Sequence, residues 1–180
     1  MQIYPDKLAS HLNKQLAAVY LVAGDDALLR ADACELIRQA AKKQQFDSNE
    51  KHLQDGKFDW HAFVDSCNAM SLFAEKRLIE LRLSSSKIGS EGSNALVALC
   101  NDLPPDTLLM IETPRVEGKP KWVKLIQDQF VFTPIYPLED KQLPAWLVQR
   151  ARQRNLQLSN AAATLLAELV TGNLLAAVQE

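Results

Sequence analysis

The sequence predicts an α/β fold, in which a mostly parallel β-sheet carries flanking helices and is followed by a small region made of helices alone. Two observations lead to this prediction. Short apolar runs typical of buried strands alternate with stretches of helical periodicity, at a spacing that implies right-handed βαβ units. After Pro137 the strand-like runs stop and only helical patterns follow.

The first strand is expected at residues 18–23, because this continuous apolar run ends at Gly24 and suits a strand buried on both faces. The aspartates at 25–26 then offer N-caps for a helix to about residue 44. The later elements are expected in this order: a weak strand at 50–54, a helix capped by Asp59, a strand at 77–83, a helix at 91–101, a buried strand at 107–113, a helix at 121–129 and a strand at 130–136. Pro134 cannot donate to a ladder, which predicts that the second half of the last strand lies at an edge of the sheet or leaves it.

The helical region gives the domain boundaries. Three helices are expected there: one from Pro144 to Asn155, one capped by Ser159 or Asn160 that runs to Val170, and one capped by Asn173 that has reached only Glu180. We therefore expect an α/β domain at 1–138 and a small helical domain at 139–180. Because the last helix has made little more than one turn at Glu180, the chain is expected to be a fragment cut inside that second domain.

Length, charge and cysteine usage narrow the class of protein. A chain of 180 residues can hold one domain, or one domain and part of another. Its net charge of -2 gives no global attraction to nucleic acid or to anionic membranes. No apolar run approaches the ~20 residues that span a bilayer, and the N-terminus lacks the pattern of a signal peptide. Three widely separated cysteines favour buried free thiols in a reducing cytoplasm over disulfides or zinc: Cys34, Cys67 and Cys100.

The helix after the first strand is where a nucleotide phosphate would bind in a βα unit. The P-loop template G-x-x-x-x-G-K-[ST], placed on Gly24, asks for Gly at Leu29, Lys at Arg30 and Ser or Thr at Ala31. Arg30 keeps a positive charge, but Leu29 has a Cβ where the backbone must wrap a phosphate. The aspartates at 25–26 add negative charge to the same loop. The pattern indicates a capped helix in a βα unit, and nucleotide binding is the minor alternative.

No set of residues predicts catalysis or a metal site. Glu112 stands alone near the end of a strand, and a lone carboxylate there is expected to be a solvated charge at the rim of the sheet. The three histidines share no local spacing that suggests a metal site or a catalytic dyad: His11, His52 and His61. We therefore predict no catalytic residues, no metal and no cofactor.

Two basic clusters could contact phosphates. One set surrounds Trp122 and the other lies along one helix: Arg115, Lys119, Lys121 and Lys124, and Arg150, Arg152 and Arg154. The second set alternates round its helix, which is typical of a solvated face. The lysines at 119, 121 and 124 are the better candidates for DNA contact, because an aromatic residue lies among them.

A crowded apolar turn precedes the strand at 77–83. Measured from Trp60 at about 100° per residue, Met70 falls on the edge of the helix core face, while Leu72 and Phe73 fall about 120–130° away on opposite sides. Neither flanking element therefore takes these two side chains into its core face. Two alternatives remain: they plug the end of the sheet or form a hydrophobic staple, or they protrude as an anchor that fills a pocket on another protein.

Three stretches of the chain resemble one family. The sequence Cys-Asn-Ala-Met-Ser-Leu-Phe-Ala at 67–74, together with Tyr-Leu-Val-Ala-Gly-Asp-Asp at 20–26 and Gly-Asn-Leu-Leu at 172–175, is similar to the delta subunits of bacterial DNA polymerase III clamp loaders. The resemblance covers the whole chain, and the order of the three stretches is more specific than any one of them.

The resemblance implies an AAA+/RecA-like P-loop-type α/β fold that does not bind ATP, followed by part of a small all-helical lid domain. The altered residues at 29–31 fit such a degenerate site. Leu175 stands where active relatives carry an Arg that senses nucleotide, and the family's Ser-Arg-Cys finger motif is absent. The family's third domain, a helical collar that assembles the loader, would lie beyond Glu180.

The resemblance also implies partners and a mechanism. Met70, Ser71, Leu72 and Phe73 would bind a pocket on the sliding clamp, the beta subunit, and favour an open ring that can be loaded on primed DNA. Gamma/tau-type subunits and delta-prime would join through the collar. The chain would then be a non-catalytic, cytoplasmic subunit of the DNA polymerase III holoenzyme. Two alternatives stay open: a divergent P-loop NTPase and a DNA-binding adaptor.

Overall fold

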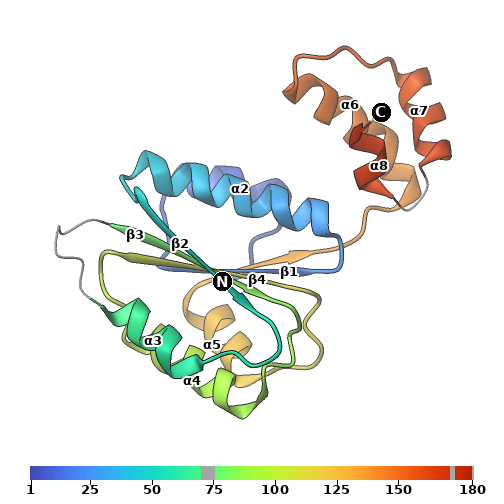
Figure 1. The fold of residues 1–180 in the computed structure, drawn as a ribbon. Helices are drawn as coiled ribbons and strands as arrows, with labels where there is room; N and C mark the ends of the chain where they lie inside the picture. Colours follow the sequence, from blue (N-terminus) through green and yellow to red (C-terminus); the bar gives the residue numbers. More distant parts are fainter. Residues whose placement is uncertain (70–75, 171–172, 180) are drawn as a thin grey trace. The chain divides into compact units, whose positions relative to one another are not determined.

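The computed structural model describes residues 1–69, 76–170 and 173–179, and its chain divides into two compact units, Met1–Ile135 and Tyr136–Glu180. Within the described ranges of the first unit, a parallel sheet has the strand order β2-β3-β4-β1-β5 and carries helices on both faces (Figure 1). The predicted α/β fold with a parallel sheet is therefore confirmed.

The first unit contains ten of the elements drawn in Figure 1 among its described residues: α1 (Pro5–Leu12), β1 (Val19–Gly24), α2 (Ala27–Lys43), β2 (Ser48–Gln54), α3 (Trp60–Asn68), β3 (Arg77–Leu83), α4 (Gly89–Asn101), β4 (Thr107–Thr113), α5 (Lys121–Gln129) and β5 (Val131–Ile135). The bounds of β3, β4 and α5 agree with the prediction. Helix α4 begins two residues before the predicted start at Glu91, and α1 was not predicted.

Strand β1 is an interior strand, between β4 and the edge strand β5. Leu21 pairs with Ile111 of β4 on one side and with Phe132 of β5 on the other. All six residues of β1 are buried, as expected for a continuous apolar run covered on both faces. Strands β2 and β5 form the two edges, so the edge position predicted from Pro134 is confirmed.

The two faces of the sheet have separate cores. Helices α1 and α2 cover one face, and α3, α4 and α5 cover the other (Figure 1). Helix α1 buries Leu8 and Leu12, which lie one turn apart on the same side. On the opposite face, Trp60 of α3 packs so closely on α4 that a Cβ at Gly92 would lie 2.5 Å from its ring.

The predicted N-caps are confirmed at four helix starts. Each cap side chain accepts a hydrogen bond from a backbone N–H three residues further on, and the four residues are Asp26, Asp59, Ser159 and Asn173. Within its described residues the second unit consists of a short 3₁₀ turn (η1, Asp140–Gln142) and of α6 (Leu143–Gln153), α7 (Asn160–Leu169) and α8 (Leu174–Gln179). It is helical throughout those ranges, as predicted.

Candidate functional site

The loop after β1 tests the predicted degenerate nucleotide site. Gly24 ends β1, and a Cβ at this position would lie 2.1 Å from the carbonyl oxygen of Ile135. This glycine is therefore required because the ends of β1 and β5 approach each other closely. Leu29 is half-buried and packs toward the core between α1, α2 and the sheet, while Ala31 is exposed.

Arg30 occupies the position of the phosphate-binding lysine in the template, yet it is buried, with 7% of its surface exposed. Its Nη1 donates to the carbonyl oxygen of Gly24. Its Nε donates to Oε1 of Glu112 on β4 at 3.1 Å. The positive charge that the sequence offered to a phosphate is thus paired with a carboxylate of the same chain.

The prediction that Glu112 is a solvated rim charge is wrong. Its side chain is 16% exposed, pairs with Arg30 and has the guanidinium of Arg82 at 4.0 Å from its second oxygen. The carboxyl ends of parallel strands meet at one edge of the sheet, so β4 delivers this carboxylate beside the loop that follows β1.

The two aspartates of the loop also accept hydrogen bonds from the backbone. Oδ1 of Asp26 accepts the backbone N–H of Leu29 at 2.8 Å, which uses one of the free donors in the first turn of α2. Oδ1 of Asp25 accepts the backbone N–H of Arg115 at 3.3 Å. Around the start of α2 the described side chains therefore present a paired arginine and three carboxylates, an arrangement that disfavours an anion.

The predicted clamp-binding residues Met70, Ser71, Leu72 and Phe73 lie outside the described residues. Both flanks of that stretch are described. Helix α3 ends at Asn68 with Cys67 fully buried, and β3 begins at Arg77. Arg77 is also buried and donates hydrogen bonds to the carbonyl oxygens of Ser66 and Cys67.

The basic cluster around Trp122 has the exposed lysines that were predicted, but its aromatic residue is buried. Lys119, Lys121 and Lys124 are exposed, as a phosphate contact requires. Trp122, however, is only 1% exposed and belongs to the core between the sheet and α5. No base could stack on it, so the reason for preferring these lysines was wrong.

The remaining polar side chains are relevant to the predicted absence of a metal site in the part of the chain that is described. There, no group of three or more His, Cys, Asp or Glu residues could hold a metal ion. His11 lies 3.3 Å from the hydroxyl of Tyr20, and His52 packs edge-on against Phe63. Across the same ranges, none of the helices is both long and apolar enough to cross a membrane.

All three cysteines are free and buried, as predicted. Burial raises the pKa of each thiol to about 12, so the thiolate form is suppressed at neutral pH: Cys34, Cys67 and Cys100.

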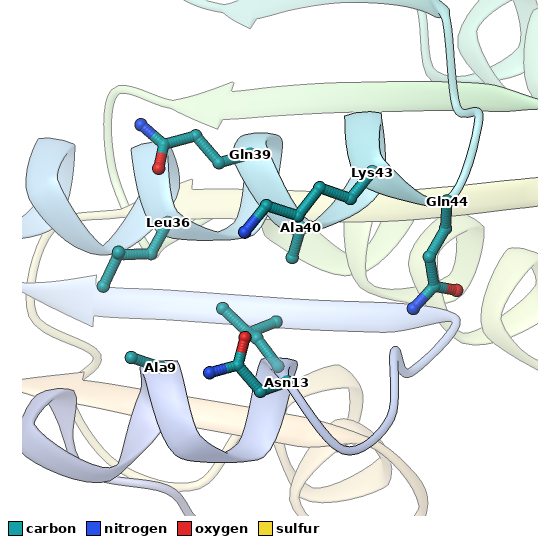
Figure 2. Close-up of a pocket in the computed structure, with 8 residues that line it drawn as sticks. Ala9, Asn13, Leu36, Gln39, Ala40, Lys43 and Gln44 are labelled. Atoms are coloured by element: carbon teal, nitrogen blue, oxygen red, sulfur yellow. The ribbon is translucent and has the colours of Figure 1, made fainter.

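A shallow hollow lies between α1 and the second half of α2 (Figure 2). The side chains of Leu36, Gln39 and Lys43 line one side, and those of Ala9 and Asn13 line the other. Because α2 starts beside the carboxyl end of β1 and runs back along the sheet, this hollow lies at the amino ends of the strands. It is therefore distinct from the loop that contains Arg30.

Sequence reasoning identified Arg30 but missed its pairing with Glu112, and it missed the role of Arg77 altogether. Arg30 and Glu112 are 82 positions apart, and no local spacing links them. Arg77 reads as an ordinary first residue of a strand, and no local pattern indicates a second role. The burial of Trp122, by contrast, could have been found, since Trp122, Val123 and Ile126 share one helical face.

Comparisons with known proteins agree with the fold and with the sequence resemblance. Residues 20–134 match the family model described as DNA polymerase III, delta subunit. The chain is 32% identical over 182 residues to the DNA polymerase III subunit delta of Escherichia coli K12, an alignment that covers 99% of this chain and 53% of that protein. The chain spans about half the length of the curated relatives it matches.

Solved structures show the same fold. The Bacillus subtilis DNA clamp loader delta protein superposes with a TM-score of 0.71 at 18% identity, covering 97% of this chain and 55% of that one. The RuvB Holliday junction branch migration motor of Thermotoga maritima superposes with a TM-score of 0.55 at 13% identity, covering 97% of this chain and 58% of that one. The fold is thus AAA+-like, and because the family model matches well over half of the residues, the chain belongs to the DNA polymerase III delta subunit family.

Proposed function

We propose that this chain is the part of a clamp-loader delta subunit that binds the sliding clamp and favours opening of its ring, so that the clamp can be loaded on primed DNA. Family membership carries the proposal. The stretch Met70-Ser71-Leu72-Phe73 is the proposed contact, because the resemblance places the clamp-binding motif there and the helical phase of the sequence assigns Leu72 and Phe73 to neither flanking core face. In this proposal residues 1–138 form the AAA+-like domain and residues 139–180 form part of a lid domain.

The proposed mechanism is mechanical. Insertion of Leu72 and Phe73 into a pocket of the clamp opens the ring only to the extent that the delta subunit binds the open form more tightly than the closed form. The other subunits, of the gamma/tau type and delta-prime, would supply ATP hydrolysis and hold the loader together. The whole complex would act on primed DNA in the cytoplasm.

The geometry around Arg30 supports a subunit that works without ATP. The guanidinium at the template's phosphate position already binds Gly24 and Glu112, and Asp25 and Asp26 lie in the same loop. A nucleotide would have to break a buried ion pair and approach three carboxylates.

Clamp binding is tested by measuring the dissociation constant of the 180-residue chain for the cognate sliding clamp. The double substitution Leu72→Ala with Phe73→Ala is expected to weaken binding by about 2–4 kcal/mol, as central hot spots do. Leu165→Ala with Leu169→Ala is a matched control, since both leucines are exposed and lie in the other unit. Parent-like binding by the Leu72/Phe73 variant would remove the proposed site.

The two alternatives are tested on the same chain. Titration with ATP and Mg²⁺ is expected to give no saturable binding, whereas a divergent NTPase predicts micromolar binding that Arg30→Met abolishes. A DNA-binding adaptor predicts an affinity for DNA that falls steeply with salt and that Lys119→Gln, Lys121→Gln and Lys124→Gln reduce together.

A further inference from the structure

The hollow between α1 and α2 has an apolar floor that no other part of the described chain covers. Leu12 forms part of this floor and is buried, Ala40 is half-buried, and Ala9 is exposed. Leu36 reaches from α2 toward α1, and 37% of its surface remains exposed (Figure 2). The volume of the hollow is about 220 Å³. An apolar cavity of about 150 Å³ already holds benzene, so the hollow has room for one large apolar side chain.

Neutral amides stand at the rim of the hollow. The side chains of Asn13, Gln39 and Gln44 line it, and Gln39 donates to Oε1 of Glu35 at 3.1 Å. Asn13 and Gln44 form no side-chain hydrogen bond with the rest of the described chain. Because an amide offers both a donor and an acceptor, these side chains can bind the backbone of a segment that lies over the floor. An apolar centre inside a polar rim is the usual anatomy of a protein–protein interface.

The C-terminal ends of the two helices add cations to this rim. Lys14 follows Asn13, and Lys42 and Lys43 are the last residues of α2. All three lysines are exposed, and among the residues that the structure describes none of them forms an ion pair or a side-chain hydrogen bond. Lys43 extends back along α2 past Ala40, which brings its charge over the hollow (Figure 2).

The carboxylates of α1 and α2 do not neutralise these lysines. Asp6 and Glu35 each pair with a basic residue of their own helix. Asp32 lies about three turns of α2 before Lys43, and Asp47 lines a separate hollow between α2 and β2. Lysines at the C-terminal ends of helices also complement the helix dipoles, but that effect requires no apolar hollow beside them.

We propose that the hollow and its three lysines dock an acidic segment of a partner protein. One large apolar side chain of that segment fills the space between Ala9 and Ala40, and several Asp or Glu residues on one side of it face Lys14, Lys42 and Lys43. Each exposed ion pair of this kind raises affinity by a factor of about 1.4–5, and salt weakens it. The inference is independent of the proposed clamp contact, because its residues all lie on α1, α2 and the turns that follow them.

The test selects peptides on the 180-residue chain itself. A displayed library of random dodecapeptides is enriched on the parent and then depleted on Ala9→Trp, whose indole fills the hollow from the exposed side of α1. Ser10→Trp is the matched control, since Ser10 is exposed on the same helix but does not line the hollow. Urea denaturation checks that each variant folds. If Ala9→Trp does not fold, Leu36→Glu takes its place, because it puts a negative charge at the exposed rim.

The peptides that survive depletion are expected to carry one Phe, Leu or Trp beside several Asp or Glu residues. They should bind Ser10→Trp like the parent and shift the amide NMR signals of the residues that line the hollow. Combining Lys14→Gln, Lys42→Gln and Lys43→Gln is expected to weaken the best peptide about tenfold and to remove most of its salt dependence. Glutamine at positions 119, 121 and 124, on the α5 side of the sheet, is expected to leave its affinity unchanged.

Three results would overturn the inference. The first is that no peptide distinguishes the parent from Ala9→Trp, or that those which do are neutral or basic. The second is equal affinity of the best peptide for the parent and for the variant with glutamine at 14, 42 and 43. The third is an equal loss in Ser10→Trp, which would place the peptide elsewhere on α1. None of these results bears on the clamp contact, which the Leu72/Phe73 variant tests separately.

Discussion

The ion pair between Arg30 and Glu112 gives a quantitative prediction. The two side chains are 9% and 16% exposed, and Nε lies 3.1 Å from Oε1. At an effective dielectric constant of about 20, unit charges about 4 Å apart attract by roughly 4 kcal/mol. The cost of removing both charges from water offsets most of this gain, so the intact pair contributes little net stability. Breaking the pair is different, because one charge then stays buried without its partner.

Glu112→Ala is therefore expected to lower the free energy of unfolding by about 3–5 kcal/mol. Glu112→Gln keeps an acceptor for Nε but loses the charge, so about half of that loss is expected. Replacing both residues, as Arg30→Met with Glu112→Leu, is expected to lie within about 1 kcal/mol of the parent, since no charge is left buried.

Urea denaturation followed by circular dichroism and tryptophan fluorescence measures these differences, and the two signals check whether the two units unfold together. The parent, Arg30→Met, Glu112→Leu and the double variant that combines them form a double-mutant cycle, which isolates the coupling between the two side chains. If the double variant loses as much stability as the two single variants added together, the side chains are uncoupled and the reasoning fails. A loss below about 0.5 kcal/mol for Glu112→Ala would have the same consequence, as that is ordinary for an exposed substitution.

Three further predictions concern other parts of the chain. Gly92→Ala should destabilise the protein by about 1 kcal/mol, because the added Cβ would meet the ring of Trp60, even though alanine favours helices. Asn94→Ala, on the exposed side of α4, should not destabilise it. The midpoints of urea denaturation of the two variants and the parent measure the difference. Burial on its own raises the pKa of Glu80, but the hydrogen bonds from Arg38 and Asn49 outweigh it and lower that pKa. The stability that Glu80 adds is therefore complete above its ordinary value of 4.5 and is lost as pH falls through the lowered value, so the difference between the parent and Glu80→Gln should shrink from pH 7 to pH 3. Finally, a thiol reagent at pH 8 should label none of Cys34, Cys67 and Cys100 in the folded chain and all three after denaturation; fast labelling of the native protein would contradict their burial.

The sequence predicted best those elements whose apolar pattern lies within the segment itself. Strand β4 is a continuous apolar run with polar ends, β3 is rich in Leu and Ile, and α5 carries a strong apolar face, so their bounds agree with the structure. Helix α1 was missed because eight residues with only two buried leucines give a weak periodic signal.

The site was less predictable because its chemistry is long-range. The template comparison identified Arg30 correctly as the altered position, but whether its charge is free depends on Glu112, which reaches it only through the pairing of β1 with β4. The same pairing explains why Glu112 was wrongly predicted to be solvated. Arg77 is a similar case, since the carbonyls that it binds become acceptors only once α3 ends beside β3.

The order of the strands has a consequence for synthesis on the ribosome. Strand β1 is made early, yet Val19 pairs with Leu109 and Tyr20 pairs with Val131, so both neighbours of this interior strand are translated late. At on the order of 5–20 residues per second, the nascent chain spends roughly 5–20 s with this apolar strand unpaired. One edge stays open to other chains until β4 has been made, and the other stays open until β5 has been made. A pause in translation ahead of Val131 therefore prolongs the time for which the β5 side of this apolar strand is open, and chaperones that cover extended apolar strands should matter while this stretch of the message is read.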